Sequence, residues 1–366
     1  MTKILVIRFS AFGDVAMTIP VIYSLAKQYP ELDITFLSRE NFKPLFQHLP
    51  SNVHFIGVDL EEYNGIWGLY RLSKELKKEK FDIVADFHNV LRTKFIRQQL
   101  HRDGSLIATL NKGRKEKKEL TRKKNKRLRP LKSTFQRYLE VLDKLSYPTE
   151  LSFLSLFKSK PQSTVQLSIK ELQHKKESDI WIGIAPFAKH KGKIYPPNLM
   201  LRVIKNVLKD NRKIILFGGG KEEIELFNKW REDYPQLIIA AKKLSLEQEL
   251  ILMDNLDCML SMDSANMHLA SLVNTPVLSI WGATHPYCGF FGWNQDLNNA
   301  IQLNMPCRPC SVFGNKACYR GDYACLVDIN PYDIVAKIED LITQPQQKGS
   351  VRKVGDLTIS SILLLQ

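Results

Sequence analysis

The stretch KILVIRFSAFGDVAMTIPVIYSL (residues 3–25) decides the fold class. An apolar run of strand length breaks at small residues and a glycine, and Asp14 then opens a segment that is predicted to be a helix. This strand–turn–helix start is the unit from which α/β sheets are built. Asp14 can cap the helix by accepting free N–H groups of the first turn. It can also be a base at the carboxyl end of the strand, where α/β proteins place their chemistry.

The same alternation of strand and helix continues along the chain. In residues 65–80, apolar side chains recur at helical spacing at Ile66, Leu69, Leu72 and Leu76. The second half of the chain repeats the alternation of strand and helix, beginning with the strand-like run IWIGIAP (180–186). Such alternation predicts parallel sheets with helices on both faces.

We therefore predict an α/β protein of two doubly wound, Rossmann-like domains that face a central cleft. The expected boundaries are an N-terminal domain over 1–160, a Ser-, Lys- and Gln-rich linker over 161–178, and a C-terminal domain over 179–340. The tail, 341–366, fits neither domain and stays unassigned. Its run ILLL is too short to span a membrane.

Composition and charge limit the classes of function. The hydrophobic fraction of 44% and the charged fraction of 25% are typical of a soluble globular protein, and no signal peptide is read at the start, so we expect a cytoplasmic location. The net charge of +15 is concentrated between Lys112 and Lys132. This run is either a solvated, mobile loop or a surface for anionic lipid, acidic glycolipid or nucleic acid. Nucleic acid is the weaker candidate, because the run contains no aromatic residue on which bases could stack.

Four of the six cysteines cluster near the end of the second half. The pattern CRPC followed by two more cysteines at wider spacing is a moderate signal for structural zinc. The alternative is a set of reduced, partly buried thiols, because disulfides are not expected in the cytoplasm. The four residues are Cys307, Cys310, Cys318 and Cys325.

A second group of polar residues follows the strand-like run CMLSMD. Asp263 is expected at the carboxyl end of a strand, with Ser264 and Ala265 at the opening of a helix. Free N–H groups and the helix dipole there suit a phosphate, and His268 could donate to the same anion. The alternative is that Asp263 and Ser264 only cap the helix while His268 packs against a strand.

Two further loops favour a nucleotide site. The loop KHKGK, after the first strand of the second half, contains Lys189, Lys191 and Lys193. The loop after the next strand is rich in glycine and is followed by Glu222. Loops at the carboxyl ends of strands in one sheet converge on one edge. There a lysine and the helix N-terminus would bind the diphosphate of a nucleotide, and the carboxylate would bind the ribose hydroxyls. The glycines match neither a P-loop nor a dinucleotide fingerprint. The chain has no Asp-x-Asp pair for a metal-held diphosphate, so the leaving group would be stabilised by Lys193 and by helix N–H groups.

These motifs together resemble glycosyltransferase family 9, the ADP-heptose:lipopolysaccharide heptosyltransferases, over about residues 1–335. The resemblance is carried by ILVIRFSAFGDVAMTIPVIYSL, by K-x-Y-P, by DSANMHLASL with TPVLSIWGAT, and by the closing CRPC segment. It implies the GT-B fold and an inverting transfer without a metal or other cofactor, with Asp14 as general base. It also implies a donor site made of Lys193, Glu222, Leu244, Asp263, Ser264 and His268, with Ala265 where the family commonly has glycine and Ala188-Lys189 where it often has threonines.

The resemblance also implies partners. They are a nucleotide-sugar donor and an anionic lipid-linked acceptor, met at the inner-membrane surface by a peripheral enzyme. Nucleic acid is not expected as a partner, because the basic run lacks aromatic residues. The basic run 112–132 would attract both the acceptor and the membrane. Arg8 is expected to stabilise the charge of Asp14. The acceptor-binding candidates are Arg8, Ser10, Gly13, Arg92 and Lys94.

Three alternatives stay open at this point. One is a family 9 transferase that uses another nucleotide sugar or acceptor. Another is a non-catalytic protein that binds membrane or nucleic acid through residues 112–132. The third is sugar-nucleotide epimerisation or dehydrogenation.

Overall fold

The computed structural model describes residues 1–157 and 163–343, and its contacts divide the chain into two compact units. Unit 1 consists of residues 1–113 and 132–156, and unit 2 of residues 114–131 and 157 onward. The expected boundaries placed all of 1–160 in one domain. The structure instead groups the basic run with unit 2, although it lies within the sequence of unit 1. Most of the unassigned tail lies outside the described residues.

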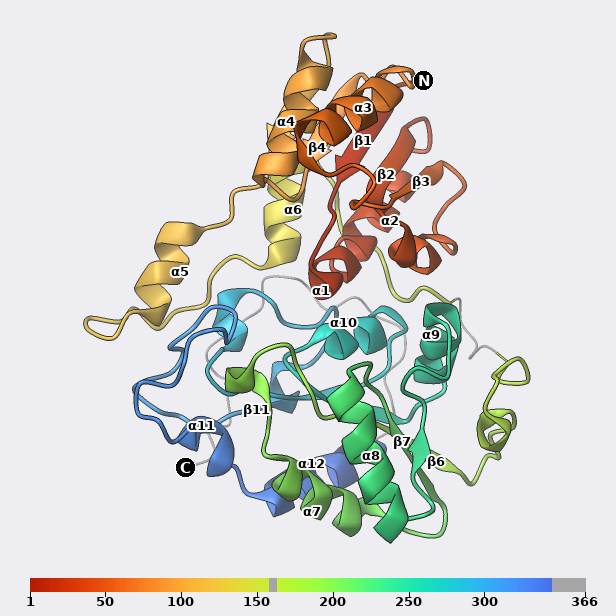
Figure 1. The fold of residues 1–366 in the computed structure, drawn as a ribbon, viewed down its shortest axis with the longest axis vertical. Helices are drawn as coiled ribbons and strands as arrows, with labels where there is room; N and C mark the ends of the chain where they lie inside the picture. The colour runs from red at the N-terminus through yellow and green to blue at the C-terminus, as the bar shows by residue number, and fades with distance from the viewer. Residues whose placement is uncertain (158–162, 344–366) are drawn as a thin grey trace. The chain divides into compact units, whose positions relative to one another are not determined.

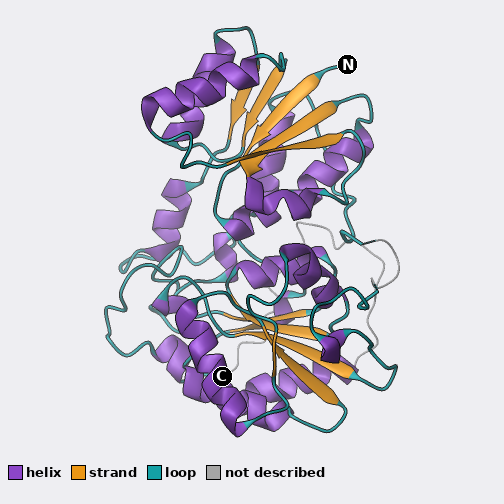
Figure 2. Cartoon of the chain, turned by 45° about the vertical axis from the view of Figure 1, so that its right-hand side comes forward, coloured by secondary structure: helices purple, strands orange, loops and turns teal. Residues whose placement is uncertain are grey.

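Unit 1 is a doubly wound α/β layer structure. Its five strands are parallel in the order β3-β2-β1-β4-β5, and helices cover the sheet (Figures 1 and 2). The strands are β1 Lys3–Ile7, β2 Asp33–Arg39, β3 Val53–Val58, β4 Ile83–Asp86 and β5 Leu106–Thr109. The helices are α1 Phe12–Ala16, α2 Ile19–Gln28, α3 Gly65–Lys77, α4 Leu91–His101 and α6 Thr134–Asp143, with a 3-10 helix at Glu40–Phe46.

Unit 2 repeats the plan with six parallel strands in the order β11-β10-β9-β6-β7-β8. The strands are β6 Ile180–Ala185, β7 Arg212–Leu216, β8 Ile238–Ile239, β9 Cys258–Met262, β10 Val277–Ile280 and β11 Ala300–Ile301. The helices are α5 Arg114–Thr121, α7 Pro197–Val207, α8 Lys221–Asp233, α9 Leu246–Asp254, α10 Ala265–Leu272, α11 Ala324–Val327 and α12 Pro331–Thr343. The prediction of two doubly wound units is confirmed.

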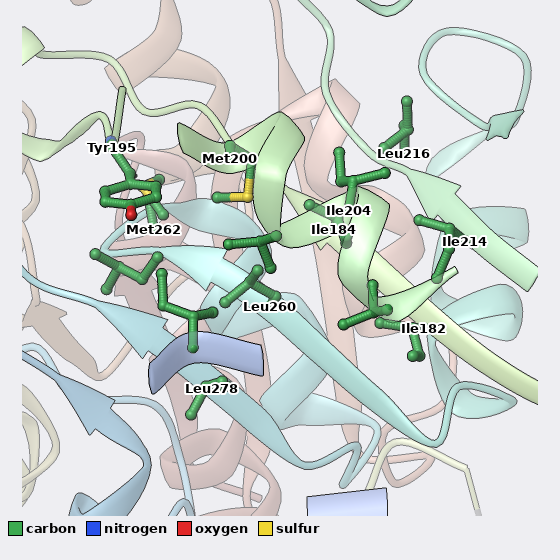
Figure 3. Packing of buried hydrophobic residues seen from close by; sticks show 14 of the residues in the cluster. Ile182, Ile184, Tyr195, Met200, Ile204, Ile214, Leu216, Leu260, Met262 and Leu278 are labelled. Carbon is green, nitrogen blue, oxygen red and sulfur yellow. The ribbon is translucent and has the colours of Figure 1, made fainter. Parts of the chain in front are cut away.

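The core of unit 2 shows why these segments form helices and strands. Figure 3 shows side chains of β6, β7 and β9 packed against the apolar face of α7. Met200, Val203, Ile204 and Val207 recur at helical spacing, and all four are fully buried, while Leu208 just after the helix is half-buried. Apolar burial of this kind contributes roughly 25 cal/mol per Å² and is the main stabilising contribution in each unit.

Strand order places one switch point in each unit. In unit 1 the chain passes from β3 at the sheet edge back to β4 beside β1, and in unit 2 it passes from β8 back to β9 beside β6. Ligands of doubly wound sheets bind outside the carboxyl ends of the strands at this point. The loops after β1 and β4, and those after β6 and β9, are therefore where a site is expected.

The structure changes two details of the sequence prediction. Ile66 was expected on the buried face of α3 with Leu72 and Leu76, but it is 71% exposed while the other two are buried. Ile66 lies in the first turn of α3, whereas the buried residues Leu72, Ser73 and Leu76 lie in its second half. The region expected as a linker, 161–178, includes a 3-10 helix at Lys170–Leu172 whose Leu172 is fully buried.

Candidate active site

Asp14 lies where the loop after β1 enters α1. Its carboxylate accepts a hydrogen bond from the backbone N–H of Ala11 at 3.2 Å, and the same oxygen pairs with Nη2 of Arg8 at 2.7 Å. A carboxylate in the first helical turn is favoured by the free N–H groups and by the helix dipole. The side chain of Asp14 keeps a quarter of its surface exposed. Asp14 therefore caps the helix and remains open to a ligand, so both interpretations of this residue are compatible with the structure.

Arg8 is a buried cation at the end of β1. It donates from Nη1 to the carbonyl oxygen of Phe87 at 2.6 Å and lies 6.0 Å from the centre of the Tyr138 ring. Burial lowers the pKa of the Arg8 guanidinium, but the neighbouring Tyr138 and Asp14 outweigh this effect, and the net pKa is raised. A buried charge needs such partners because desolvation is costly. Arg8 therefore fixes the position of the Asp14 carboxylate.

Tyr138 also supports Asp14, through a contact that no sequence pattern predicts. Its hydroxyl donates to the backbone carbonyl of Asp14 at 3.1 Å, and its ring stacks on Phe87 at 4.5 Å. Tyr138 belongs to α6, far along the chain from β1. Only an apolar position on a helix is visible in its sequence, so its role follows from the tertiary structure.

The loop after β4 lies beside the loop after β1. Asp86 is fully buried and accepts the backbone N–H groups of His88 and Asn89, while Arg97 pairs with its other oxygen. This brings His88 next to Ser10, with Ser10 Oγ 3.4 Å from His88 Nε2. His88 was not singled out from the sequence, although it follows a strand that ends in an aspartate.

The other acceptor candidates lie near this edge of the sheet. Gly13 is within α1, and Arg92 and Lys94 lie in the first turn of α4, which begins just after the loop holding His88. Arg92 is half-buried and Lys94 is exposed. The charge of Arg92 contributes to lowering the pKa of His88. The structure thus places these residues at one strand edge, and their roles stay a prediction.

In unit 2 the corresponding edge brings Lys193 and Asp263 together. Nζ of Lys193, in the 3-10 helix Lys191–Lys193 after β6, lies 3.1 Å from Oδ2 of Asp263, which follows β9. Thr284, fully buried after β10, donates to the same oxygen at 2.8 Å. Three strand ends therefore contribute to one polar cluster. Thr284 was not singled out from the sequence as a site residue.

The segment after Asp263 forms a helix entry as predicted. Ser264 is the N-cap of α10, its hydroxyl lies 3.2 Å from that of Ser261, and Ala265 begins the helix. Ala265 is not among the residues with positive φ, so the methyl group in place of glycine creates no backbone strain. His268 lies in the first turns of α10 with 7% of its surface exposed.

Glu222 and Leu244 lie on neighbouring parts of unit 2. Glu222 is exposed in the first turn of α8, whereas the next residue, Glu223, accepts the N–H groups of Gly219 and Gly220 at 2.8 and 3.1 Å. Leu244 is half-buried just before Ser245, the N-cap of α9. Glu223 therefore holds the glycine loop, and Glu222 stays available to a ligand.

Comparison with known proteins decides the family. The model of glycosyltransferase family 9 (heptosyltransferase) matches residues 69–318. The chain belongs to this family. Lipopolysaccharide heptosyltransferase 1 of Campylobacter coli is 24% identical to the transferase, and the match covers 93% of this chain and 98% of that protein. Lipooligosaccharide heptosyltransferase 2 of Haemophilus influenzae is 25% identical, with 93% and 100% covered.

Solved structures confirm the fold of the transferase. The ADP-heptose lipopolysaccharide heptosyltransferase II of Escherichia coli matches with a TM-score of 0.67 at 19% identity, covering 93% of this chain and 98% of that one. The two doubly wound units are thus those of the GT-B fold.

The basic run of the transferase is a docked arm, which we define as residues 114–131. Leu120 and Leu131 are buried against Cys288, and Nζ of Lys126 donates to the carbonyl oxygens of Cys307 at 2.6 Å and Pro309 at 2.9 Å. Burial lowers the pKa of Lys126. The arm is therefore not a wholly solvated loop, because these contacts join it to the rest of unit 2.

The cysteines predicted to cluster line one small pocket in unit 2 together with Arg308. All six cysteines of the described residues are free, and burial raises the pKa of Cys325 to about 11. Within residues 1–157 and 163–343, no group of three or more His, Cys, Asp or Glu side chains is arranged to hold a metal ion. Structural zinc at Cys307, Cys310, Cys318 and Cys325 stays an untested prediction.

Within the part of the chain that the structure describes, no helix has both the length and the apolar character that crossing a membrane requires.

Proposed function

We propose that this transferase moves a heptose from ADP-heptose to the lipopolysaccharide inner core, with inversion at the anomeric carbon and without a metal ion. The observation that supports it most is the pair of polar strand edges. One edge offers a carboxylate, Asp14, and the other a lysine beside a helix N-terminus, Lys193 with α10. The names of the relatives in Campylobacter coli and Haemophilus influenzae support the same substrate class.

In this proposal Asp14 serves the acceptor. Its carboxylate takes the proton of the acceptor hydroxyl as the oxygen forms a bond to the anomeric carbon of the heptose. Arg8 pairs with one carboxylate oxygen and so holds the group in place. The partial exposure of Asp14 gives a sugar hydroxyl access to it.

The groups of unit 2 serve the donor. The bond between the anomeric carbon and the diphosphate oxygen breaks, and its electron pair leaves with ADP. The charge that develops on this oxygen would be stabilised by the Lys193 ammonium and by the free N–H groups at the start of α10. Asp263 and Thr284 keep Lys193 in place before the donor arrives.

We further propose that the arm meets the anionic acceptor at the membrane surface. Its exposed cations include Lys115, Lys118, Lys124 and Arg129, and its own contacts leave them facing solvent. Juxtamembrane Lys and Arg side chains each contribute about 1 kcal/mol of attraction to anionic lipid. The transferase would then be a peripheral protein of the cytoplasmic face.

Calorimetric titration with ADP, UDP and GDP in the presence of EDTA tests the donor side. We expect ADP to bind most tightly, and Lys193→Ala to weaken ADP binding about tenfold because one charge-assisted contact is lost. Lys229→Ala, an exposed lysine on α8, is the matched control and should bind normally. Tighter binding of UDP or GDP would overturn the donor assignment, and binding abolished by EDTA would overturn metal independence.

The catalytic role of Asp14 requires a second variant. Asp14→Asn keeps a side-chain oxygen for the helix cap but cannot accept the proton. We expect it to bind ADP as the wild type does while heptose transfer falls by a factor of about 10² to 10⁴, the usual contribution of a general base. Transfer at more than a tenth of the wild-type rate would contradict the role of Asp14.

A further inference from the structure

The loops after β1 and β4 form a paired hydrogen-bond system at the switch point of unit 1. Ile7, the last residue of β1, is in register with Asp86, the last residue of β4, so the two loops leave the sheet side by side. The backbone N–H of Phe9 lies 3.5 Å from Nδ1 of His88, and Ser10 Oγ lies 3.4 Å from Nε2. Both ring nitrogens of His88 therefore face the residues that lead to Asp14.

The orientation of the His88 ring is fixed from several directions. Its backbone N–H donates to Asp86 Oδ1 at 2.9 Å, and Asp86 is fully buried and paired with Arg97. The ring of Phe9 meets the imidazole edge-on, with 6.3 Å between centres and 64° between planes. The histidine is thus a built part of this edge and not a solvated side chain.

The charge state of His88 follows from its surroundings. Burial and the nearby cations Arg8, Lys112 and Arg92 together lower the pKa of His88 to about 3, although the carboxylate of Asp14 acts in the opposite direction. The imidazole is therefore neutral at pH 7 and carries one ring proton.

The tautomer of His88 follows from the neighbouring backbone. The N–H of Phe9 can only donate, so Nδ1 must accept and the ring proton must be on Nε2. Nε2–H then donates to Ser10 Oγ, and the hydroxyl proton of Ser10 is left free to donate elsewhere. Because Ser10 is half-buried and close in sequence to Asp14, this proton can meet a ligand of that carboxylate.

We propose that His88 is a positioning residue which, as the Nε2–H tautomer, holds Ser10 so that its hydroxyl donates to an oxygen of the acceptor sugar beside Asp14. This inference deepens the proposed function and rests on it for the identity of the acceptor. His88 takes no proton in the reaction, which is left to Asp14. Ser10 then contributes to acceptor binding and orientation.

The tautomer is tested without any assay of transfer. Full-length protein labelled with ¹⁵N-histidine is examined by NMR at pH 7, with His88→Gln used to assign the resonances. We expect the pattern of a neutral Nε2–H tautomer, and in Ser10→Ala a shift of the Nε2–H signal with no change of tautomer. A charged ring or an Nδ1–H tautomer would overturn the proposal. Because this readout needs no substrate, it stands even if the heptosyltransferase assignment fails.

The functional consequence is tested by kinetics with ADP-heptose and a Kdo-bearing lipid acceptor. His88→Ala and Ser10→Ala should each raise the KM for the acceptor about tenfold, the loss of about one hydrogen bond, and leave the KM for the donor within threefold. The double variant should be no worse than either single one, because both remove the same contact. Equal effects on donor and acceptor, or additive losses, would overturn the proposal.

A conservative variant separates positioning from acid–base chemistry. The amide of His88→Gln can accept from Phe9 and donate to Ser10, so its acceptor KM should stay within about threefold of the wild type and its pH–rate profile should be unchanged. Loss of one limb of the profile would mean that His88 itself transfers a proton, which would overturn the proposal. His54→Gln, on an exposed histidine of β3, is the matched control.

Discussion

At the scale of single residues, Asp14 shows how one side chain combines a local and a functional role. Its carboxylate closes the first turn of α1 and also meets Arg8, so the helix cap fixes the group that the proposed reaction uses. The strand–turn–helix pattern was enough to single out Asp14. The sequence does not predict that Arg8 contacts Phe87, that Ser10 contacts His88 or that Asp14 contacts Tyr138. These partners belong to segments that come near the loop after β1 only when the sheet folds.

Glu249 on α9 gives a residue-scale prediction about pH. Burial raises its pKa to about 7. In the unfolded chain the Glu249 carboxyl ionises near its ordinary pKa of about 4.5. Between pH 4.5 and 7 the folded state therefore binds more protons than the unfolded state, and the free energy of unfolding falls as pH rises. Above pH 7 the loss is complete.

Glu249→Gln should remove this loss. We expect its free energy of unfolding to equal that of the wild type near pH 4.5 and to exceed it by roughly 1–3 kcal/mol at pH 8, measured by denaturant unfolding. Glu247→Gln, on the exposed side of the same helix, is the control and should show no such trend. A difference that is constant from pH 4.5 to 8 would contradict the role of Glu249.

At the scale of elements, the arm and α3 depart furthest from sequence expectation. The cations of the arm suggested a solvated loop, but Leu120 and Leu131 are buried and Lys126 binds two carbonyl oxygens of unit 2. In α3 the helical spacing predicted a face that included Ile66, which is in fact exposed. In both cases the local pattern did not determine which residues are covered, because that depends on the surface against which the segment packs.

Lys126→Ala tests how the arm is held. Two hydrogen bonds to the rest of unit 2 disappear, and we expect amide hydrogen exchange over residues 120–131 to become about tenfold faster, since each such bond stabilises by about 1 kcal/mol. Lys124→Ala, an exposed neighbour, should leave the exchange rate unchanged. Equal exchange in the wild type and Lys126→Ala would show that the apolar contacts alone hold the arm.

At the scale of the whole molecule, charge is distributed unevenly. The chain carries a net charge of +15, and the arm, with ten Lys and Arg residues against two Glu, contributes +8 of it. This excess does not affect the fold, but it determines which surfaces the protein approaches.

The charge predicts salt-dependent attraction to anionic vesicles. In a sedimentation assay, binding to vesicles that contain phosphatidylglycerol should exceed binding to neutral vesicles and should fall at least tenfold between 0.05 and 0.5 M salt. Replacing Lys115, Lys118 and Lys124 with Glu should reduce binding by at least tenfold. Replacing the exposed Lys74, Lys170 and Lys229 with Glu is the charge-matched control. Equal losses in both triple variants would show that total charge, and not the arm, governs the attraction.

The fold class and the identity of the residues at the strand ends could be predicted from the amino-acid sequence. The spacing of apolar residues identifies strands and helices from the local sequence. In a parallel sheet the loops that follow the strands all lie at one edge, so the residues of these loops can be assigned to that edge. Three further features depend on the folded chain: the arm belongs to unit 2, Thr284 joins Lys193 and Asp263, and His88 faces Ser10. These contacts depend on strand order and on packing between distant segments, which no local pattern records.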